Sequence, residues 1–370
     1  MKVFVTGGAG FIGSHLVDLL LADGAEVRIL DALDQQVHDG RPAYLSTEAE
    51  FVQGDIRNRE VVRHCLSGAD AVVHLAAAVG VAQSMYEIER YTSVNALGAA
   101  VVLQEAIQLR DRLEKMVVAS SMSIYGEGLY RCPAEGRRVM PGTRSEQQLQ
   151  ARRWELLCPS CGNELEPVAT PETKRLAPTS IYAIGKRDHE EMFLMWGRAY
   201  RVPVTALRFF NVYGPRQALS NPYTGVTAIF ASRLLNRRSP ILFEDGRQLR
   251  DFVHVRDVAR SIALALEPGA ADGLALNVGT GRPVTVLDVA ITLSRGLGLA
   301  IEPVVRDMYR AGDIRHCFAD ASLAHETLQF DTAVSFEDGM RELAGWLAKQ
   351  KAEDRVDEAT DALQRFSLTS

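Results

Sequence analysis

"TGGAGFIG", Thr6–Gly13, follows a short apolar run and precedes a segment with helical periodicity. Gly8, Gly10 and Gly13 fit the spacing G-x-G-x-x-G. With Gly7 in place of Gly8, the stretch also fits G-x-x-G-x-x-G. Glycines in such a strand–turn–helix let the backbone approach a pyrophosphate, which the free N–H groups of the helix start can bind. The stretch therefore predicts a dinucleotide-binding turn; a purely structural turn is the alternative.

A carboxylate at the end of the second predicted strand extends this site. Asp31 lies 18 residues after Gly13, where a carboxylate binds the ribose hydroxyls of NAD and would repel the 2′-phosphate of NADP. Asp55, after the third predicted strand, could reach the adenine or belong to a simple turn. The candidate cofactor-binding residues in this part of the chain are Gly7, Gly10, Phe11, Ile12, Gly13, Asp31, Asp55 and Ile56.

Strands and helices are predicted to alternate over most of the first 210 residues. The predicted strands are Lys2–Thr6, Glu26–Leu30, Glu50–Gln53, Ala69–His74, Lys115–Ser120 and Val204–Phe209, and the main helices are Phe11–Ala22, Met85–Leu109 and Tyr182–Tyr200. This alternation is typical of the α/β class with a Rossmann-type, doubly wound parallel sheet. We expect the NAD-binding domain to span residues 1–210. A smaller α+β substrate domain should mostly occupy 211–350, with a helix at Val286–Gly296, and 351–370 should be a charged, solvated helical tail.

The composition disfavours several classes of partner. The 370 residues carry a net charge of −6 at pH 7, so no basic field favours nucleic acid or an anionic membrane. No segment approaches the about 20 apolar residues of a membrane span, and a predicted strand stands in the place of a signal peptide. Five cysteines do not make a disulfide framework. We therefore expect a cytoplasmic protein with reduced thiols.

Three residues predict acid–base chemistry. Tyr182 and Lys186 stand four residues apart in "SIYAIGKRDHE", on one face of a predicted helix. An ammonium beside a phenol favours the phenolate, so we expect Lys186 to lower the pKa of Tyr182 as a general base requires. Ser121, in "ASSMSIYG", follows a predicted parallel strand, where ligands bind in such sheets. An isolated YxxxK pair is common by chance, but in this context it predicts a catalytic set.

The alternation of strands and helices fails between Gly126 and Leu176, a segment rich in Arg, Pro, Gly and Glu. We call residues 127–175 the insert; loops of this length are usually functional or separately folded. It contains "YRCPAEG" and "LLCPSCG", so three thiolates are available from Cys132, Cys158 and Cys161. Paired knuckles of this kind are typical of a zinc ribbon.

Seven motifs together resemble those of the extended short-chain dehydrogenase/reductases, specifically the NAD-dependent nucleotide-sugar epimerase/dehydratase family. The resemblance covers about residues 1–345 apart from the insert, through "TGGAGFIG", "DAVVHLAA", "SSMSIYG", "YAIGK", "RFFNVYGPRQ", "DGRQLRDFVHVRDVA" and "NVGTG". It implies that Tyr182 is the base, that Lys186 holds the nicotinamide ribose, and that Ser121 aligns the sugar hydroxyl. It also implies cofactor contacts from His74, Leu75, Ala76, Ala77, Asn95, Tyr182, Lys186 and Phe210, and substrate contacts from Ser121, Asn211, Arg250, Arg310 and Asp313. The Arg forks independently suit a diphosphate.

The residues after Ser121 indicate which reaction of the family to expect. Dehydratases of the family carry an acidic pair there, and decarboxylating relatives usually carry a Glu two residues after the serine. This chain has Met122 and Ser123, which cannot move protons as a carboxylate does. We therefore expect a 4-epimerase with tightly bound NAD. A nucleotide-sugar 4-ketoreductase, a dehydratase and a binding protein on the same fold are the alternatives.

The insert lengthens the separation of Ser121 and Tyr182 to 61 residues. It resembles the insert of bacterial dTDP-L-rhamnose 4-epimerases, whose first knuckle tends to read C-P-x-H, whereas Glu135 takes the place of that His here. The resemblance implies a structural zinc held by Cys132, Cys158 and Cys161 and completed by Glu135, water or another residue. A loop without metal and a redox-active CxxC are the alternatives.

The same resemblance implies a substrate and an assembly. The substrate would be a dTDP-6-deoxyhexose such as dTDP-L-rhamnose, used in carbohydrate biosynthesis, with a UDP-hexose or UDP-uronate as the alternative. Val79 departs from some UDP-galactose 4-epimerases, which have Lys there, so their way of orienting the diphosphate need not transfer. Members of the family commonly form homodimers through two helices per subunit, here those expected at Met85–Leu109 and Tyr182–Tyr200.

Overall fold

The molecule is built around a seven-stranded parallel sheet. We describe it from a computed structural model that covers residues 1–310 and 312–369; Ala311 and Ser370, the last residue of the expected tail, lie outside it. The sheet has the order β13-β9-β5-β4-β1-β2-β3, and all neighbouring strands run parallel. Its strands are β1 (Lys2–Thr6), β2 (Glu26–Asp31), β3 (Glu50–Gln53), β4 (Ala71–His74), β5 (Lys115–Ser121), β9 (Val204–Phe209) and β13 (Ala275–Val278). The predicted α/β class and Rossmann-type sheet are confirmed.

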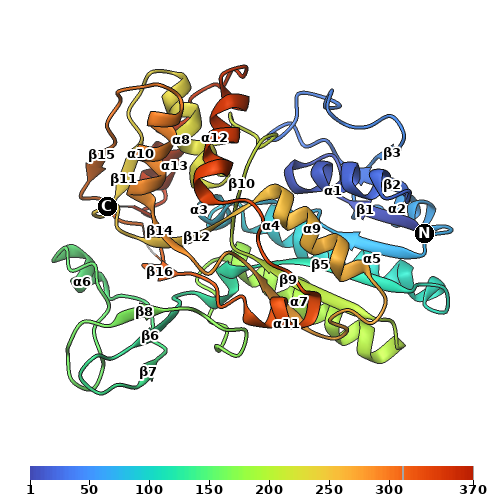
Figure 1. The fold of residues 1–370 in the computed structure, drawn as a ribbon, viewed down its shortest axis with the longest axis horizontal. Helices are drawn as coiled ribbons and strands as arrows, with labels where there is room; N and C mark the ends of the chain where they lie inside the picture. Colours follow the sequence, from blue (N-terminus) through green and yellow to red (C-terminus); the bar gives the residue numbers. More distant parts are fainter. Residues whose placement is uncertain (311, 370) are drawn as a thin grey trace.

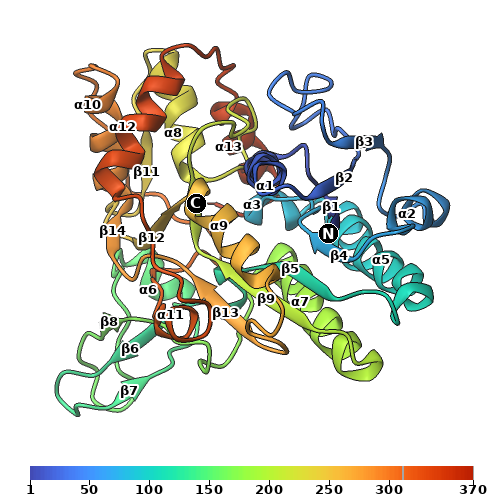
Figure 2. The same cartoon turned by 45° about the vertical axis from the view of Figure 1, so that its right-hand side comes forward.

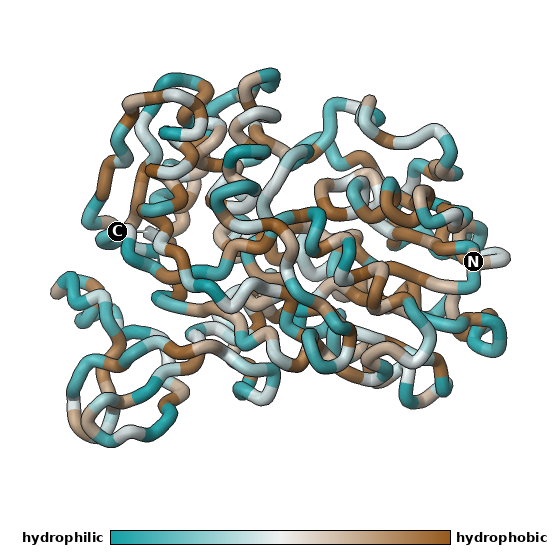
Figure 3. Tube along the Cα trace, viewed as in Figure 1, coloured by the Kyte–Doolittle hydropathy of each residue, from teal (hydrophilic) through white to brown (hydrophobic). Residues whose placement is uncertain are grey.

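Helices cover both faces of this sheet (Figure 1). One face packs against α1 (Phe11–Ala22), α9 (Val255–Leu266) and α11 (Ser322–Leu328), and the other against α2 (Arg59–Leu66), α5 (Gly98–Ala106) and α7 (Ile181–Tyr200). Within β1, Val3 and Val5 face the first layer and Phe4 the second, as the apolar strands of a doubly covered sheet require. Figure 3 shows the resulting apolar strands in brown. Strand β13 and helix α9 come from beyond residue 210. The parallel sheet and its covering helices therefore extend past residue 210, the expected end of the NAD-binding domain.

The second region carries its own core. Short strands β10 (Asn211–Tyr213), β12 (Leu249–His254), β14 (Pro283–Thr285) and β16 (His316–Cys317) form one sheet, and β11 (Ile241–Phe243) pairs with β15 (Val304–Arg306). Helices α8 (Val226–Leu235), α10 (Val286–Gly296) and α12 (Phe336–Leu347) pack beside them through residues such as Phe230, Leu293 and Met340.

The expected helix Met85–Leu109 is interrupted. It is replaced by α4 (Ile88–Thr92), a π-helical turn at Ser93–Leu97, α5 and a 3₁₀ turn at Ile107–Leu109, and the short helix α3 (Val81–Ser84) precedes them. The π-helical turn contains Asn95, whose amide exchanges hydrogen bonds of 2.8 and 3.1 Å with the backbone of Ala78. Such turns often mark functional sites in helices. Periodicity alone does not reveal them, because the apolar face continues across the turn.

The insert forms a small separate unit that projects from the body (Figures 1 and 2). Strands β6 (Leu129–Arg131), β7 (Arg138–Val139) and β8 (Glu166–Val168) make an antiparallel sheet of order β7-β6-β8. The short helix α6 (Glu146–Gln150) lies between β7 and β8 in the chain. The buried residues of this unit are Tyr130, Cys132, Val139, Leu156, Cys158 and Leu165.

The C-terminal segment is not a solvated tail, and that prediction was wrong. It forms α13 (Val356–Arg365), in which Ala359 and Leu363 are buried. The apolar face of α13 is narrow, and charged residues flank it in the sequence. The hydrophobic pattern alone therefore does not indicate that this helix packs against the rest of the protein. Among the described helices, none is both long enough and apolar enough to cross a membrane.

Candidate active site

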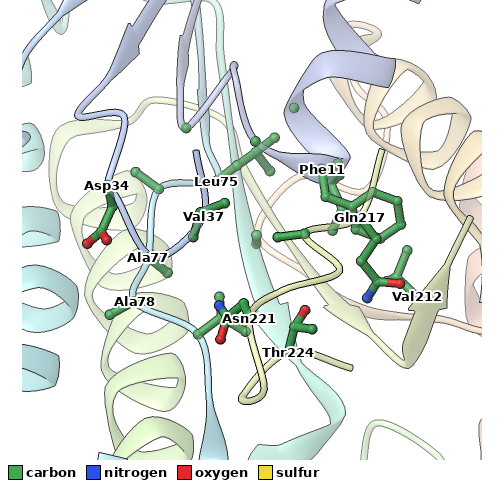
Figure 4. A pocket seen from close by; sticks show the side chains of 18 of the residues that line it. Phe11, Asp34, Val37, Leu75, Ala77, Ala78, Val212, Gln217, Asn221 and Thr224 are labelled. Atoms are coloured by element: carbon green, nitrogen blue, oxygen red, sulfur yellow. The ribbon is translucent and has the colours of Figure 1, made fainter. Parts of the chain in front are cut away.

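A cavity of about 620 Å³ opens at the carboxyl ends of β1, β2, β4 and β5, the edge where parallel sheets bind ligands. Figure 4 shows Phe11, Leu75 and Gln217 around it. The structure brings most of the predicted cofactor residues together here. They are Gly7, Gly10, Phe11, Ile12, Gly13, Asp31, Asp55, Ile56, Leu75, Ala76, Ala77, Tyr182, Lys186 and Phe210.

The glycine turn at the base of this cavity cannot carry side chains at two positions. Gly7 has a φ of +71°, and a Cβ there would lie 2.8 Å from the backbone N of Ala76. A Cβ at Gly13 would lie 2.2 Å from the Gly7 carbonyl oxygen. Gly10 caps α1 without a side-chain hydrogen bond, so the first N–H groups of α1 are left for a ligand. The turn therefore fits a dinucleotide pyrophosphate.

Asp31 is held in place at the end of β2. Its Oδ2 accepts the N–H of Ala9 at 3.0 Å, and its Oδ1 accepts that of Leu33 at 2.9 Å. The carboxylate also borders the cavity, which suits a ribose diol and disfavours a 2′-phosphate. Asp55 is paired with Arg57, and that hydrogen bond lowers the pKa of Asp55.

Two predicted cofactor residues lie behind the cavity wall instead of in it. His74 is fully buried and its Nδ1 lies 2.9 Å from the Thr6 hydroxyl. Asn95 is also fully buried and fixes Ala78. Both residues position the loop after β4. Several wall residues were not predicted as site residues: Asp34, Gln36, Tyr44, Arg90, Gln217 and Asn221. Gln217 ends the motif "RFFNVYGPRQ", which is the one signal that could have revealed it, and Arg90 lies in α4. The others lie in irregular loops without a motif.

Ser121, Tyr182 and Lys186 meet at the inner end of the cavity. Ser121 ends β5, while Tyr182 and Lys186 occupy the first turns of α7, which Ser180 caps by accepting the N–H of Ala183 at 3.1 Å. The Lys186 Nζ donates to the Ala119 carbonyl at 3.0 Å.

The pKa values differ from the expectation. Burial raises the pKa of Tyr182 to about 12, against a smaller lowering by Ser121, and burial lowers the pKa of Lys186 to about 8. In this environment desolvation outweighs any help that Lys186 gives to the phenolate.

Ser123 supports Ser121, a role that the sequence did not reveal. The Ser121 Oγ accepts hydrogen bonds from the Ser123 hydroxyl at 2.9 Å and from the Ser123 N–H at 3.2 Å. With its acceptor positions filled, the Ser121 hydroxyl is left to donate its own proton into the cavity.

A second cavity, of about 370 Å³, meets the first one. The residues that border both include Ser121, Tyr182, Phe210 and Asn211. The predicted substrate residues Arg250, Arg310 and Asp313 border the second cavity. A large ligand in each cavity would therefore touch the same two hydroxyls.

The second cavity holds polar groups that suit a nucleoside diphosphate. The Arg310 guanidinium lies 4.1 Å from the centre of the Phe243 ring, and burial lowers the pKa of Arg310. Buried atoms without a partner among the described residues include Nε of Arg310 and Oδ1 of Asn211. Arg250, in contrast, already has hydrogen-bond partners within the protein. Its guanidinium donates to the carbonyls of Leu249, Ile314 and Arg315 at 2.6–2.9 Å.

The insert brings its two knuckles face to face. Ligand atoms of Cys132, Glu135, Cys158 and Cys161 all lie within 4.8 Å of one another. The Sγ atoms of Cys132 and Cys161 are 3.5 Å apart, and the Cys158 Sγ lies 3.9 Å from the Glu135 Oε2. Zinc–sulfur bonds of about 2.3 Å in a tetrahedron place ligands roughly 3.8 Å apart. Each knuckle ends at a glycine of positive φ, Gly136 at +66° or Gly162 at +75°.

The chain is similar to known proteins over most of its length. The model of the NAD dependent epimerase/dehydratase family matches residues 3–145 and 156–279. A dTDP-L-rhamnose 4-epimerase of Burkholderia thailandensis is 36% identical over 360 residues, covering 94% of this chain and 95% of the relative. The structure of a Thermotoga maritima UDP-glucose 4-epimerase with UDP-glucose matches at a TM-score of 0.76 and 32% identity, and that of a Thermus thermophilus UDP-glucose 4-epimerase with NAD at 0.74 and 31%. Both structural matches cover 94% of this chain and 99% of the other.

Proposed function

The chain belongs to the NAD-dependent epimerase/dehydratase family, and we propose that it is a nucleotide-sugar 4-epimerase, an isomerase that works with bound NAD. The observation that carries the proposal is the position of Ser121 and Tyr182, whose side chains border both cavities. A cofactor in the first cavity and a hexose in the second would meet at these two hydroxyls. Epimerisation at C4 needs this arrangement, because the hydride leaves C4 and the proton leaves the oxygen bound to that carbon.

The chain's own residues supply the proton chemistry. Tyr182 would take the proton of the C4 hydroxyl, while Ser121 donates to the same sugar oxygen and Lys186 stabilises the phenolate. The residues that border the first cavity would hold NAD. When bound, it would supply a hydride acceptor and donor for C4 and, while oxidised, positive charge beside the phenol. The last effect would offset the burial that raises the pKa of Tyr182.

The surroundings of Ser121 favour epimerisation over dehydration. Met122 is buried, and the Ser123 hydroxyl donates to Ser121. Among the described residues that border the second cavity, Asp313 is the only one with a carboxylate, and its Oδ1 accepts the N–H of Ile314. Elimination or decarboxylation would need a free carboxylate beside C5 or C6.

For the substrate we propose a dTDP-6-deoxyhexose such as dTDP-L-rhamnose. The similarity to a dTDP-L-rhamnose 4-epimerase over almost the full length of both chains supports it. Arg310 on Phe243 would hold the diphosphate, because its Nε is buried without a partner among the described residues. The similarity to UDP-glucose 4-epimerases keeps a UDP-hexose or UDP-uronate as the second candidate.

The test is turnover in D2O without added cofactor, followed by proton NMR, for dTDP-L-rhamnose, UDP-glucose and UDP-glucuronate separately. We expect C4 inversion of one sugar with no deuterium at C5. Deuterium at C5, loss of water, or a requirement for added NAD(P)H would assign the protein to the dehydratases or reductases. As a matched control, Tyr182→Phe should lower kcat by roughly 10³-fold while NAD stays bound.

We also propose that the chain forms a homodimer through α4, the π-helical turn and α7. These elements lie side by side. Their surface exposes Ile88, Leu97, Ile184 and Met195, which are 45–63% accessible, and apolar residues gathered on adjacent helices commonly mark an interface. Size-exclusion chromatography with light scattering should give twice the chain mass. The Met195→Glu variant should give the mass of a single chain.

For the knuckles we propose a structural zinc bound by Cys132, Cys158, Cys161 and Glu135. The separations of the ligand atoms support it, as does the place of Glu135 in "CPAEG", equivalent to that of Cys161 in "CPSCG". The site needs reduced cysteines, and we propose a cytoplasmic location, where thiols stay reduced.

A further inference from the structure

After α12 ends at Leu347, the chain runs back toward the active site and forms α13 (Val356–Arg365) there. In Figure 2, α13 lies between α8 and the N-terminal half of the molecule. The second cavity is bordered by five residues of this segment, Val356, Ala359, Thr360, Leu363 and Leu368. The same cavity is bordered by Ser121, Tyr182 and Arg310. We call residues 356–369 the C-terminal roof.

The first residues of the roof and the residues just before it are anchored on α8 and on the turn that follows α8. Asp354 and Asp357 lie 3.1–3.4 Å from the guanidinium groups of Arg233 and Arg238. The Ser232 hydroxyl donates to the Glu353 carbonyl at 3.1 Å. Because Arg233 and Asp354 are almost fully buried, detaching this segment from α8 would leave an unpaired buried charge, which is strongly unfavourable.

The other end is anchored across the cavity, on the N-terminal half. The Phe366 ring stacks on Tyr86, with 4.7 Å between ring centres and 12° between planes. The Tyr86 hydroxyl donates in turn to that of Tyr223 at 2.8 Å. Thr369 donates to the Tyr309 carbonyl at 2.9 Å, directly before Arg310. The roof thus bridges both sides of the cavity.

The chemistry of the roof differs between its two faces. Its acidic side chains at Asp357, Glu358 and Asp361 are exposed, whereas the residues toward the cavity are aliphatic apart from Thr360. Aliphatic side chains fill space without offering hydrogen bonds that would fix the orientation of a hexose. An aliphatic wall of this kind allows a bound sugar to rotate within the cavity while it hinders release of the sugar from the cavity.

We propose that the C-terminal roof is part of the substrate site and retains the 4-keto intermediate while that intermediate turns between the two hydride transfers. The proposal rests on the proposed function. Oxidation at C4 breaks the C4–H and O–H bonds, reduces NAD and leaves a ketone. If the ketone escapes before the hydride returns, the released 4-keto sugar is matched by one reduced cofactor left on the enzyme.

The experiment compares the full-length enzyme with Leu363→Ala, with Phe366→Ala and with a chain ending at Gln350. Substrate is added in excess, and the near-ultraviolet absorbance of reduced cofactor is recorded together with released 4-keto sugar by NMR. We expect the variants to release ketone relative to product roughly tenfold more often. The epimerase activity of these variants should fall in proportion to the amount of reduced cofactor that accumulates on the enzyme. Gln364→Ala, exposed on the same helix, should behave as wild type.

Two results would overturn the proposal. One is a truncated enzyme that epimerises at the wild-type rate without accumulating reduced cofactor. The other is a faster truncated enzyme, which would make the segment an obstruction to substrate. If truncation unfolds the chain, the two point variants decide, with thermal unfolding measured beside them. Failure of the proposed function is distinguishable, because the full-length enzyme would then epimerise none of the three sugars.

Discussion

The guanidinium of Arg315 is fully buried and bonds to Glu155 of the insert, with Nη2 and Nε at 2.6 and 3.0 Å from Oε1. The same guanidinium bonds to Glu244 and Asp245, which directly follow β11, at 2.7–3.0 Å. The insert also holds the backbone beside it, because Glu127 accepts the N–H of Arg315 at 2.8 Å. One buried cation therefore joins the insert to the substrate half.

This junction lies directly behind the predicted diphosphate residues. Arg250 donates to the carbonyls of Ile314 and Arg315, and Arg144 of the insert donates to that of Asp313 at 3.0 Å. The segment that follows Arg310 is thus held from both sides. These hydrogen bonds of the insert support the backbone that carries the predicted diphosphate residues.

Glu155→Gln tests the brace. The variant removes a charged hydrogen-bond acceptor from Arg315, so we expect the free energy of unfolding to fall by about 2 kcal/mol. We also expect KM for the nucleotide sugar to rise about tenfold as the loop loosens, with NAD affinity unchanged. Chemical denaturation and steady-state kinetics measure these effects. Glu166→Gln is the control, because its pair with Arg131 on the insert surface is exposed and such pairs contribute little.

Acid should weaken the same junction. Burial alone would raise the pKa of Glu155, but hydrogen bonds from His316 and Arg315 outweigh it and lower that pKa to about 2. A carboxylate with a depressed pKa stabilises the fold fully above its unfolded value and loses that effect as the pH falls toward 2. Burial also lowers the pKa of His316, so its protonation opposes folding in the same direction.

The measurement is urea denaturation of wild type and Glu155→Gln at pH 7, 5 and 3. The stability difference between them should shrink between pH 5 and pH 3, where Glu155 is protonated in the unfolded chain before it is protonated in the folded one. A difference that does not change with pH would mean that the Glu155 charge contributes nothing to folding.

Ser123→Ala tests the support of the catalytic serine. Loss of one neutral hydrogen bond, about 1 kcal/mol, should lower kcat roughly fivefold with little change in KM. Ser123→Thr keeps the hydroxyl and should restore most of the rate. An unchanged kcat in Ser123→Ala would show that Ser121 needs no second donor, and equal losses in both variants would indicate a packing defect instead.

The parts of the fold that could be predicted are those governed by local pattern. The apolar run Lys2–Thr6 and the periodic segment Phe11–Ala22 became β1 and α1 with the same bounds. The glycine turn could be placed because steric limits at Gly7 and Gly13 leave few other residues possible. Ser121, Tyr182 and Lys186 followed from a motif in a fixed strand–helix context.

The parts that could not be predicted depend on contacts between distant segments. Asn95 interrupts a helix in order to bond with Ala78, which no periodicity records. The roof is charged on its outer face, and its position depends on contacts with Tyr86, Tyr309 and α8, which come from distant parts of the chain. The partners of Arg315 come from 70–71 and 160 residues away.

Metal analysis of the purified protein distinguishes the three interpretations of the knuckles. We expect about one zinc per chain, lost in Cys158→Ser, with a lower thermal midpoint because the insert loses its cross-link. Glu135→Cys would supply a fourth thiolate at the place equivalent to Cys161. It should slow zinc release to a chromogenic chelator, whereas Glu135→Ala should hasten it.

Zinc removal should act on the substrate side of the enzyme. The knuckles are joined to Arg315 through β6 and Glu155, so chelation should raise KM for the nucleotide sugar in the same direction as Glu155→Gln, with NAD retained. A metal-free protein of unchanged thermal midpoint would make the knuckles a loop without metal. A disulfide between Cys158 and Cys161 that forms and reduces reversibly, with activity following its state, would make them a redox element instead.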